Sequence, residues 1–184
     1  MKLKQTLKAW PVIALATIGL CYLTQLVAGW FGVELPEQKN VGQIREMFRH
    51  AFESWRYFGA SAINAALVLG LLPALEELVF RYLIFMLPVR FLRREGTARN
   101  YSSPACPHAG RGATLAIALM TSIAFSAAHY IMQPFPDNAF IALGFFGFMQ
   151  CWLYLKTDRL WCPILNHALF NLTNLILLLI IPIK

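Results

Sequence analysis

The sequence has few charged residues. Only 14% of its 184 residues are charged, whereas 58% are hydrophobic and the mean hydropathy is +0.55. A soluble domain of this length does not need so many apolar residues to fill its core, so the composition indicates a membrane protein. The net charge of +7 comes from basic residues that flank apolar runs without an independent folded domain around them, which argues against nucleic acid as a partner.

Motifs of several common site types are also missing. The four cysteines are scattered without a C-x-x-C pair, so we predict neither a disulfide framework nor a zinc module and interpret them as packing residues. No G-x-S-x-G turn surrounds Ser126, which argues against a rhomboid-like serine protease. Cys106 and His108 can be read as half a metal site, but the Gly-, Pro- and charge-rich composition of residues 93–111 favours a solvated loop.

Five apolar segments are long enough to cross a bilayer, which takes about 20 residues each. They cover residues 10–33, 57–89, 112–136, 138–155 and 160–183. We therefore predict an all-α fold, a polytopic transmembrane helix bundle with about five spans, of which the fourth is the shortest. Lys2, Lys4 and Lys8 precede the first span, and no small-residue cleavage site follows it, so this span is predicted to be a signal anchor.

Basic residues set the predicted orientation of the bundle. The N-terminal segment, residues 90–111 and residues 156–159 are rich in Lys and Arg, whereas residues 133–137 have none. Because such residues favour the cytoplasmic side, the N-terminus is predicted to be cytoplasmic and the C-terminus outside. Residues 34–56 mix charges with apolar residues at helical spacing, which predicts an amphipathic helix lying in the membrane interface.

Ionisable residues inside the apolar segments are the candidate functional residues, because burying such a group unpaired in hydrocarbon is expensive. They are Glu76, Glu77, Arg81, His129 and His167. On a helix Glu77 and Arg81 are i and i+4 and can form an ion pair. Glu76 points about 100° away from Glu77, which leaves it as the carboxylate without a partner in its own helix.

The two histidines have partners at helical spacing. Phe125 precedes His129 by four residues, so its ring can cover one side of the imidazole, and Asn171 follows His167 by four residues on one helix face. A lone histidine on an apolar helix is more often a packing residue. Two of them on separate spans, together with an in-membrane Asn and the unpaired Glu76, favour a functional site inside the bilayer.

Three motifs occur in order on successive apolar segments: E-E-x-x-x-R at 76–81, F-x-x-x-H at 125–129 and H-x-x-x-N at 167–171. This arrangement resembles the CPBP family of intramembrane proteases, which includes the CAAX prenyl endopeptidases and bacterial enzymes labelled Abi or bacteriocin-processing. The resemblance implies a single membrane-embedded domain over residues 1–184. Residues 1–56 would supply the first span and the interfacial segment, and residues 57–184 the catalytic core of a multi-pass protein of the bacterial plasma membrane.

The resemblance also implies an activity and a role for each residue. The protein would cleave membrane-associated proteins or peptides, such as C-terminal sorting tails or leader peptides, with prenylated tails the least favoured in a bacterium. Glu76 and His129 would activate a water molecule, while His167 and Asn171 would stabilise the oxyanion. The supporting residues would be Glu77, Arg81 and Phe125.

Two questions stay open at this point. We prefer catalysis without a cofactor, because no compact H-E-x-x-H is present and Asn is a poor zinc ligand, but Glu76, His129 and His167 are also an acceptable zinc set. The alternative function is a non-enzymatic membrane protein, either an immunity or scaffold protein or a small transporter, whose buried charges are structural. Pro73 would permit the helix break that transporters use. The expected partners are the lipid bilayer and the substrate.

Overall fold

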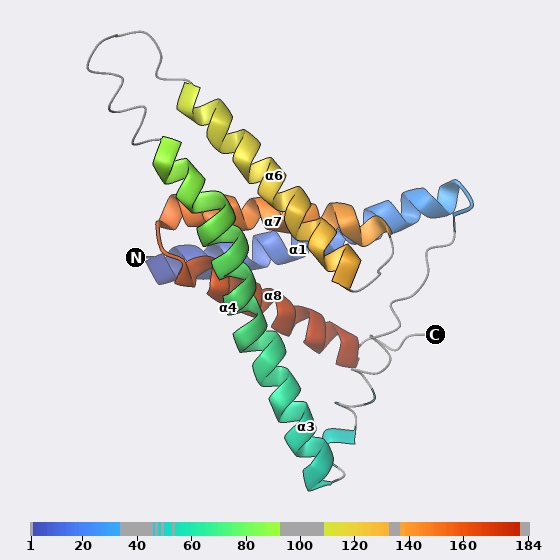
Figure 1. Ribbon diagram of the computed structural model, residues 1–184. Helices are drawn as coiled ribbons and strands as arrows, with labels where there is room; N and C mark the ends of the chain where they lie inside the picture. The colour runs from blue at the N-terminus through green and yellow to red at the C-terminus, as the bar shows by residue number, and fades with distance from the viewer. Residues whose placement is uncertain are drawn as a thin grey trace, which may run out of the picture.

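The computed structural model describes residues 2–33, 46, 48, 50–52, 54–92, 109–132 and 137–180, and within them it has helices and no strand. The elements are α1 (Lys2–Trp30), the 3₁₀ turn η1 (His50–Phe52), α3 (Trp55–Ala66), η2 (Leu67–Leu71), α4 (Leu72–Glu76), η3 (Glu77–Met86), α6 (Ala109–Met132), α7 (Asp137–Thr157) and α8 (Trp161–Ile180) (Figure 1). Five helical stretches of the described chain are long and apolar enough to cross a membrane, which confirms the predicted all-α bundle.

The second span is longer than predicted. From α3 to η3 and on to Leu92 the chain forms one continuous helix, Trp55–Leu92. At 1.5 Å per residue it is about 55 Å long, against about 30 Å for the hydrocarbon core of a bilayer. Its first turn includes residues 55 and 56, which were assigned to the interfacial segment; that segment otherwise lies mostly outside the described residues.

The predicted loop of residues 93–111 ends earlier than expected. Residues 109–111 already belong to α6, so the third span begins before the predicted boundary at residue 112. The rest of the loop, with Cys106 and His108, lies outside the described residues. The helix boundary differs because a Gly-rich, polar sequence does not show where tertiary packing begins to stabilise the first helical turn.

Pro73 does not break the long helix, although the sequence would permit a break. The turn before it, η2, is π-helical, and the N–H of Leu72 donates to the carbonyl of Leu67, five residues back. The carbonyl of Val68 would next be served by the N–H of residue 73, which proline lacks. The side-chain amide of Asn171, on α8, donates to this carbonyl instead at 2.9 Å. The carbonyl that Pro73 leaves without a donor is therefore the point at which the second span is bonded to the fifth.

Helix α7 is the centre of the bundle. It contacts α1, α6, α8 and η3, and 39% of its apolar window is buried, more than in any of the other four spans. Its sequence is apolar on all sides, as expected for a helix surrounded by others. A small residue lets α6 come close, because a Cβ atom at Gly147 would lie 3.3 Å from the Cα atom of Ser122 and 3.3 Å from the ring of Phe125.

Two clusters of buried apolar side chains fill the bundle. One consists of Phe85, Met86, Val89, Ala118, Cys151 and Tyr154, and the other of Ile13, Ala14, Phe125, Phe146 and Phe170. The second cluster draws on α1, α6, α7 and α8, so the first span is part of the packed bundle. Cys151 and Cys162 are buried without a disulfide, in agreement with their interpretation as packing residues.

Three chain segments meet at one end of the bundle. Arg90, at the end of the second span, forms a 2.9 Å ion pair with Asp158, in the turn between α7 and α8. Lys8 of α1 and Lys156 of α7 line a common cavity there. Figure 1 likewise shows the N-terminus beside the end of α7. The predicted orientation requires this clustering of basic segments on one side, and their assignment to the cytoplasm remains a prediction.

The close contact at Gly147 can be tested by substitution. We expect Gly147→Val to destabilise the protein by about 1–3 kcal/mol, because its side chain would push the backbone of α6 away from α7. Gly144→Val is the matched control on the same helix, since nothing lies within 4 Å of a Cβ atom at that position. Thermal unfolding in detergent measures both; equal effects of the two substitutions would contradict the proposed close packing.

Candidate active site

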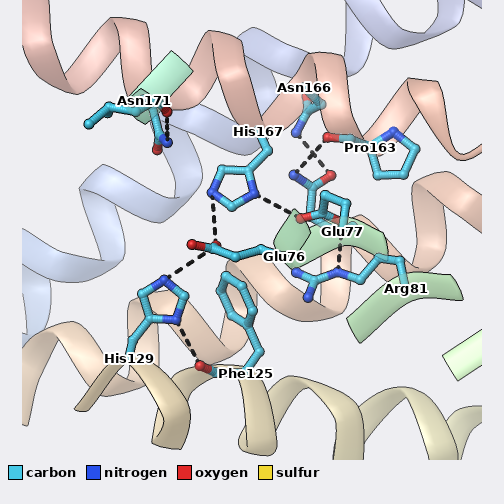
Figure 2. A network of polar contacts seen from close by, with 11 residues as sticks. Glu76, Glu77, Arg81, Phe125, His129, Pro163, Asn166, His167 and Asn171 are labelled. Carbon is cyan, nitrogen blue, oxygen red and sulfur yellow. Dashed lines mark hydrogen bonds and ion pairs between the residues drawn. The ribbon is translucent and has the colours of Figure 1, made fainter. Parts of the chain in front are cut away.

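Polar side chains from three of the spans meet inside the bundle (Figure 2). Glu76, Glu77 and Arg81 come from the second span, His129 from α6, and His167 and Asn171 from α8. All the residues that the sequence singled out as candidates therefore lie in one region. They lie on the Pro73-containing helix, on α6, which packs closely against α7, and on α8.

Glu77 joins two of these elements. Its Oε2 atom lies 3.0 Å from Nε of Arg81, which is the ion pair expected from the i, i+4 spacing, and its Oε1 atom lies 2.8 Å from Nδ1 of His167. Glu77 and Arg81 are both fully buried. The guanidinium of Arg81 also lies over the ring of Phe125, 4.2 Å from its centroid, which is a favourable position for a cation. The contact with His167 was not anticipated from the sequence.

Each of the two histidines, His129 and His167, is held through its Nδ1 atom. Nδ1 of His129 donates to the carbonyl of Phe125 at 2.9 Å, and Nδ1 of His167 contacts Glu77. Because a carbonyl oxygen can only accept, Nδ1 of His129 carries a hydrogen, and in the neutral ring Nε2 keeps its lone pair. The ring of Phe125 lies 4.4 Å from the ring of His129, centroid to centroid, as its spacing in the sequence indicated.

Glu76 faces both histidines. Its Oε2 atom lies 3.5 Å from Nε2 of His129 and 3.7 Å from Nε2 of His167. These separations are too long for good hydrogen bonds, and this oxygen is buried with no hydrogen-bond partner among the described residues. A buried carboxylate oxygen without a partner is unfavourable, so a small donor between these three atoms would stabilise it. A water molecule is such a donor.

A cavity of about 240 Å³ adjoins Glu76. Its polar lining consists of Glu76, His129, His167, Asn171 and Asn174. Several water molecules fit into this volume, since each occupies about 30 Å³ in the liquid. One N–H of the Asn171 amide donates to the carbonyl of Val68, and the same nitrogen carries a second N–H.

Asn174 and Phe146 are among the residues of this cavity that were not singled out in the sequence. Asn174 lies three residues after Asn171 on the same helix face, so the rule that found Asn171 would also have found it. Phe146 is fully buried, and its ring stands nearly edge-on to that of His167 at 5.0 Å, centroid to centroid. No pattern distinguishes Phe146 from the other apolar residues of its span.

A second polar contact positions α8 close to the site. The amide of Asn166 donates to Oε1 of Gln150 at 3.2 Å, and both side chains are fully buried. This bond joins α7 to α8 one residue before His167. An amide pair is the kind of contact that holds helices together in a membrane, where apolar side chains gain nothing from leaving lipid.

The same groups bear on the question of zinc. A carboxylate and two imidazoles are acceptable zinc ligands, and zinc-bound histidines are commonly held through their other ring nitrogen, as these are. Within the described part of the chain, however, no group of three or more His, Cys, Asp and Glu side chains is arranged so that it could hold a metal ion.

The bond between Asn171 and Val68 yields a prediction. Asn171→Ala should cost about 1–3 kcal/mol of stability, because it leaves the carbonyl of Val68 without a donor. In a Pro73→Ala background, residue 73 regains an N–H, and the cost of Asn171→Ala should fall to less than half. A double-mutant cycle by thermal unfolding measures this coupling. Asn174→Ala serves as the control and should not depend on residue 73; strictly additive effects of P73A and N171A would contradict the assignment.

One protein-family model matches most of this region. Residues 58–173 match the family model described as "Type II CAAX prenyl endopeptidase Rce1-like". The match spans more than half of the chain and contains all three motifs. No curated protein and no solved structure matches the chain.

Proposed function

The chain belongs to the type II CAAX prenyl endopeptidase Rce1-like family, and from this we propose that it is an intramembrane endopeptidase in which Glu76 activates water. The family match confirms the resemblance to CPBP intramembrane proteases and, with the five spans, makes the chain a multi-pass membrane protein of the CAAX protease type. One observation carries the proposed mechanism. Oε2 of Glu76 is buried without a partner and faces Nε2 of both histidines.

The first step is the attack of water. A water molecule between Glu76 and His129 donates one hydrogen to Oε2 of Glu76 and the other to Nε2 of His129, whose Nδ1–H is held by the carbonyl of Phe125. Glu76 takes the proton as the water oxygen bonds to the carbonyl carbon of the scissile peptide. The electron pair of the C=O double bond moves to the carbonyl oxygen, which becomes the oxyanion.

The second step is the collapse of this tetrahedral species. Asn171 offers its remaining N–H to the oxyanion, and His167 donates from Nε2 when both of its ring nitrogens carry hydrogen, with Nδ1–H held by Glu77. The C–N bond then breaks, and the proton on Glu76 passes to the leaving nitrogen. Glu77 and Arg81 act as supporting residues, because they hold His167 and the motif helix in place.

The proposed substrates are membrane-associated proteins or peptides. Hydrolysis requires an unfolded scissile segment, because the carbonyl of a helical residue is already bonded within its helix. Asn174 is exposed and lines the cavity beside Asn171, so the two amides can bond to the backbone of an extended segment. We favour C-terminal sorting tails and leader peptides over prenylated tails, and the plasma membrane of a bacterium as the location.

Two adjacent carboxylates provide the main test of the proposal. Glu76→Gln should lower the rate of cleavage by about 10²–10⁴-fold with little loss of stability, because it removes the proton acceptor but leaves the buried ion pair of Glu77 and Arg81 intact. Glu77→Gln should instead destabilise the fold by about 3–5 kcal/mol, because Arg81 stays buried without its partner. Thermal unfolding measures stability. Cleavage is measured with the protein in vesicles and three reporter peptides, which carry a sorting tail, a leader or a prenyl group.

The same pair of variants separates the proposal from a non-enzymatic function. A structural charge network centred on Glu77 and Arg81 would tolerate Glu76→Gln, and no peptide would be cleaved by wild type above the level of empty vesicles. Undiminished cleavage by Glu76→Gln would exclude Glu76 as the base.

Dependence on metal is a separate prediction. If Glu76 and His129 activate the water without a metal ion, exhaustive treatment with a tight chelator should change the rate of cleavage less than about 2-fold, and elemental analysis of the purified protein should find no stoichiometric zinc. An apo protein whose lost activity returns on addition of zinc would instead assign Glu76, His129 and His167 as ligands.

A further inference from the structure

A second cavity, of about 290 Å³, lies between the start of α1 and the end of α7. It shares no lining residue with the cavity at Glu76. Figure 1 shows these two helix ends side by side. Nothing in the proposed reaction uses it.

Basic and aromatic side chains mark the rim of this cavity. Lys8 of α1 and Lys156 of α7 are both exposed, and none of the described residues that line the cavity is acidic. The ammonium group of Lys156 lies over the ring of Trp152, 4.6 Å from its centroid. Lysine and tryptophan are typical of the boundary between headgroups and acyl chains, where each presents a polar end and an apolar body.

The wall of the cavity is apolar. It consists of Ala9, Val12, Ile13, Met149 and Leu153. Along α1 this wall continues to side chains that face outward, since Val12 is 65% and Leu15 71% exposed. A ligand seated between the two lysines therefore meets a lipid-facing apolar surface on one side, which suits an acyl chain and does nothing for a free phosphate ion.

One polar atom in the cavity lining lacks a partner. Oε1 of Gln5 is buried, and no described residue donates a hydrogen bond to it. Such an atom is stabilised by a donor from a ligand. The hydroxyl groups of a glycerol headgroup are donors of this kind.

We propose that this cavity binds one anionic glycerophospholipid. Its phosphate lies between Lys8 and Lys156, a headgroup hydroxyl donates to Gln5, and an acyl chain follows the wall formed by Val12 and its neighbours. Basic pockets between spans on the cytoplasmic side commonly bind such headgroups. The bound lipid bridges α1 and α7, and it thereby braces the central helix that carries Phe146 in the active site.

Native mass spectrometry of the detergent-solubilised full chain tests this proposal. Titration with dioleoylphosphatidylglycerol should show one tightly bound lipid, and dioleoylphosphatidylcholine should bind about 10-fold more weakly or worse. Lys8→Gln and Lys156→Gln should each weaken binding of the glycerol lipid about 5-fold, and the double variant about 30-fold. Lys4→Gln is the matched control, with the same change of charge on the same helix but outside the cavity lining.

Several results would overturn the proposal. Equal binding of the two lipids, or a double variant that binds like Lys4→Gln, would exclude a specific headgroup site. Displacement of the lipid by millimolar inorganic phosphate would assign the site to a free anion. Because both lysines are exposed, their substitution should leave thermal unfolding in lipid-free detergent unchanged. Gln5→Ala provides a second readout, because it should weaken the binding of the hydroxyl-bearing lipid only.

Discussion

The buried contact of Glu77 with both Arg81 and His167 is the interaction on which the site depends. An unpaired charge inside a membrane protein is unfavourable, and here the carboxylate and the guanidinium neutralise each other within one helix. The second oxygen of Glu77 then bonds Nδ1 of His167 on another helix. One side chain therefore keeps a cation buried and also decides which nitrogen of His167 faces Glu76. The ring of Phe125, between Arg81 and His129, extends the same set of contacts to the third helix.

Near Pro73 a backbone group of the second span is likewise satisfied by a side chain of α8. Proline leaves the carbonyl of Val68 without a donor in its own helix, and Asn171 supplies one from α8. His167 and Asn171, four residues apart, are thus both bonded to the second span, one through a side chain and one through a carbonyl. The result is a fixed face of α8 opposite Glu76. The proposed general acid–base catalysis would need such a placement, because it requires atoms held within hydrogen-bonding distance of the reacting groups.

Packing around α7 supports these polar contacts. The absence of a side chain at Gly147 brings α6 close and seats Phe125, while Gln150 bonds the helix to α8. At its far end α7 meets α1 around the cavity between Lys8 and Lys156. The central helix is thus held by small-residue packing and an amide pair, with the proposed lipid at its end. Because lipid provides no hydrophobic force between helices, such specific contacts have to fix their positions.

Much of this arrangement could be predicted from individual sequence features. Uncharged runs of about 20 residues can only be buried in lipid as helices, which determines the all-α fold and the approximate spans. The spacing of Glu77 and Arg81 determines their ion pair within one helix, and it leaves Glu76 without a partner in that helix. Helical spacing likewise places Phe125 against His129, because neighbours four residues apart meet whatever surrounds the helix.

Contacts between helices were decided only by the tertiary structure. The bond from Glu77 to His167, the bond from Asn171 to Val68 and the position of Phe146 join segments that are far apart in the chain, and no local spacing encodes them. The sequence could not show that the helix continues through Pro73, because the donor that compensates for the missing N–H lies on α8. Periodicity determines which face of a helix a residue occupies; the packing of five helices determines what that face meets.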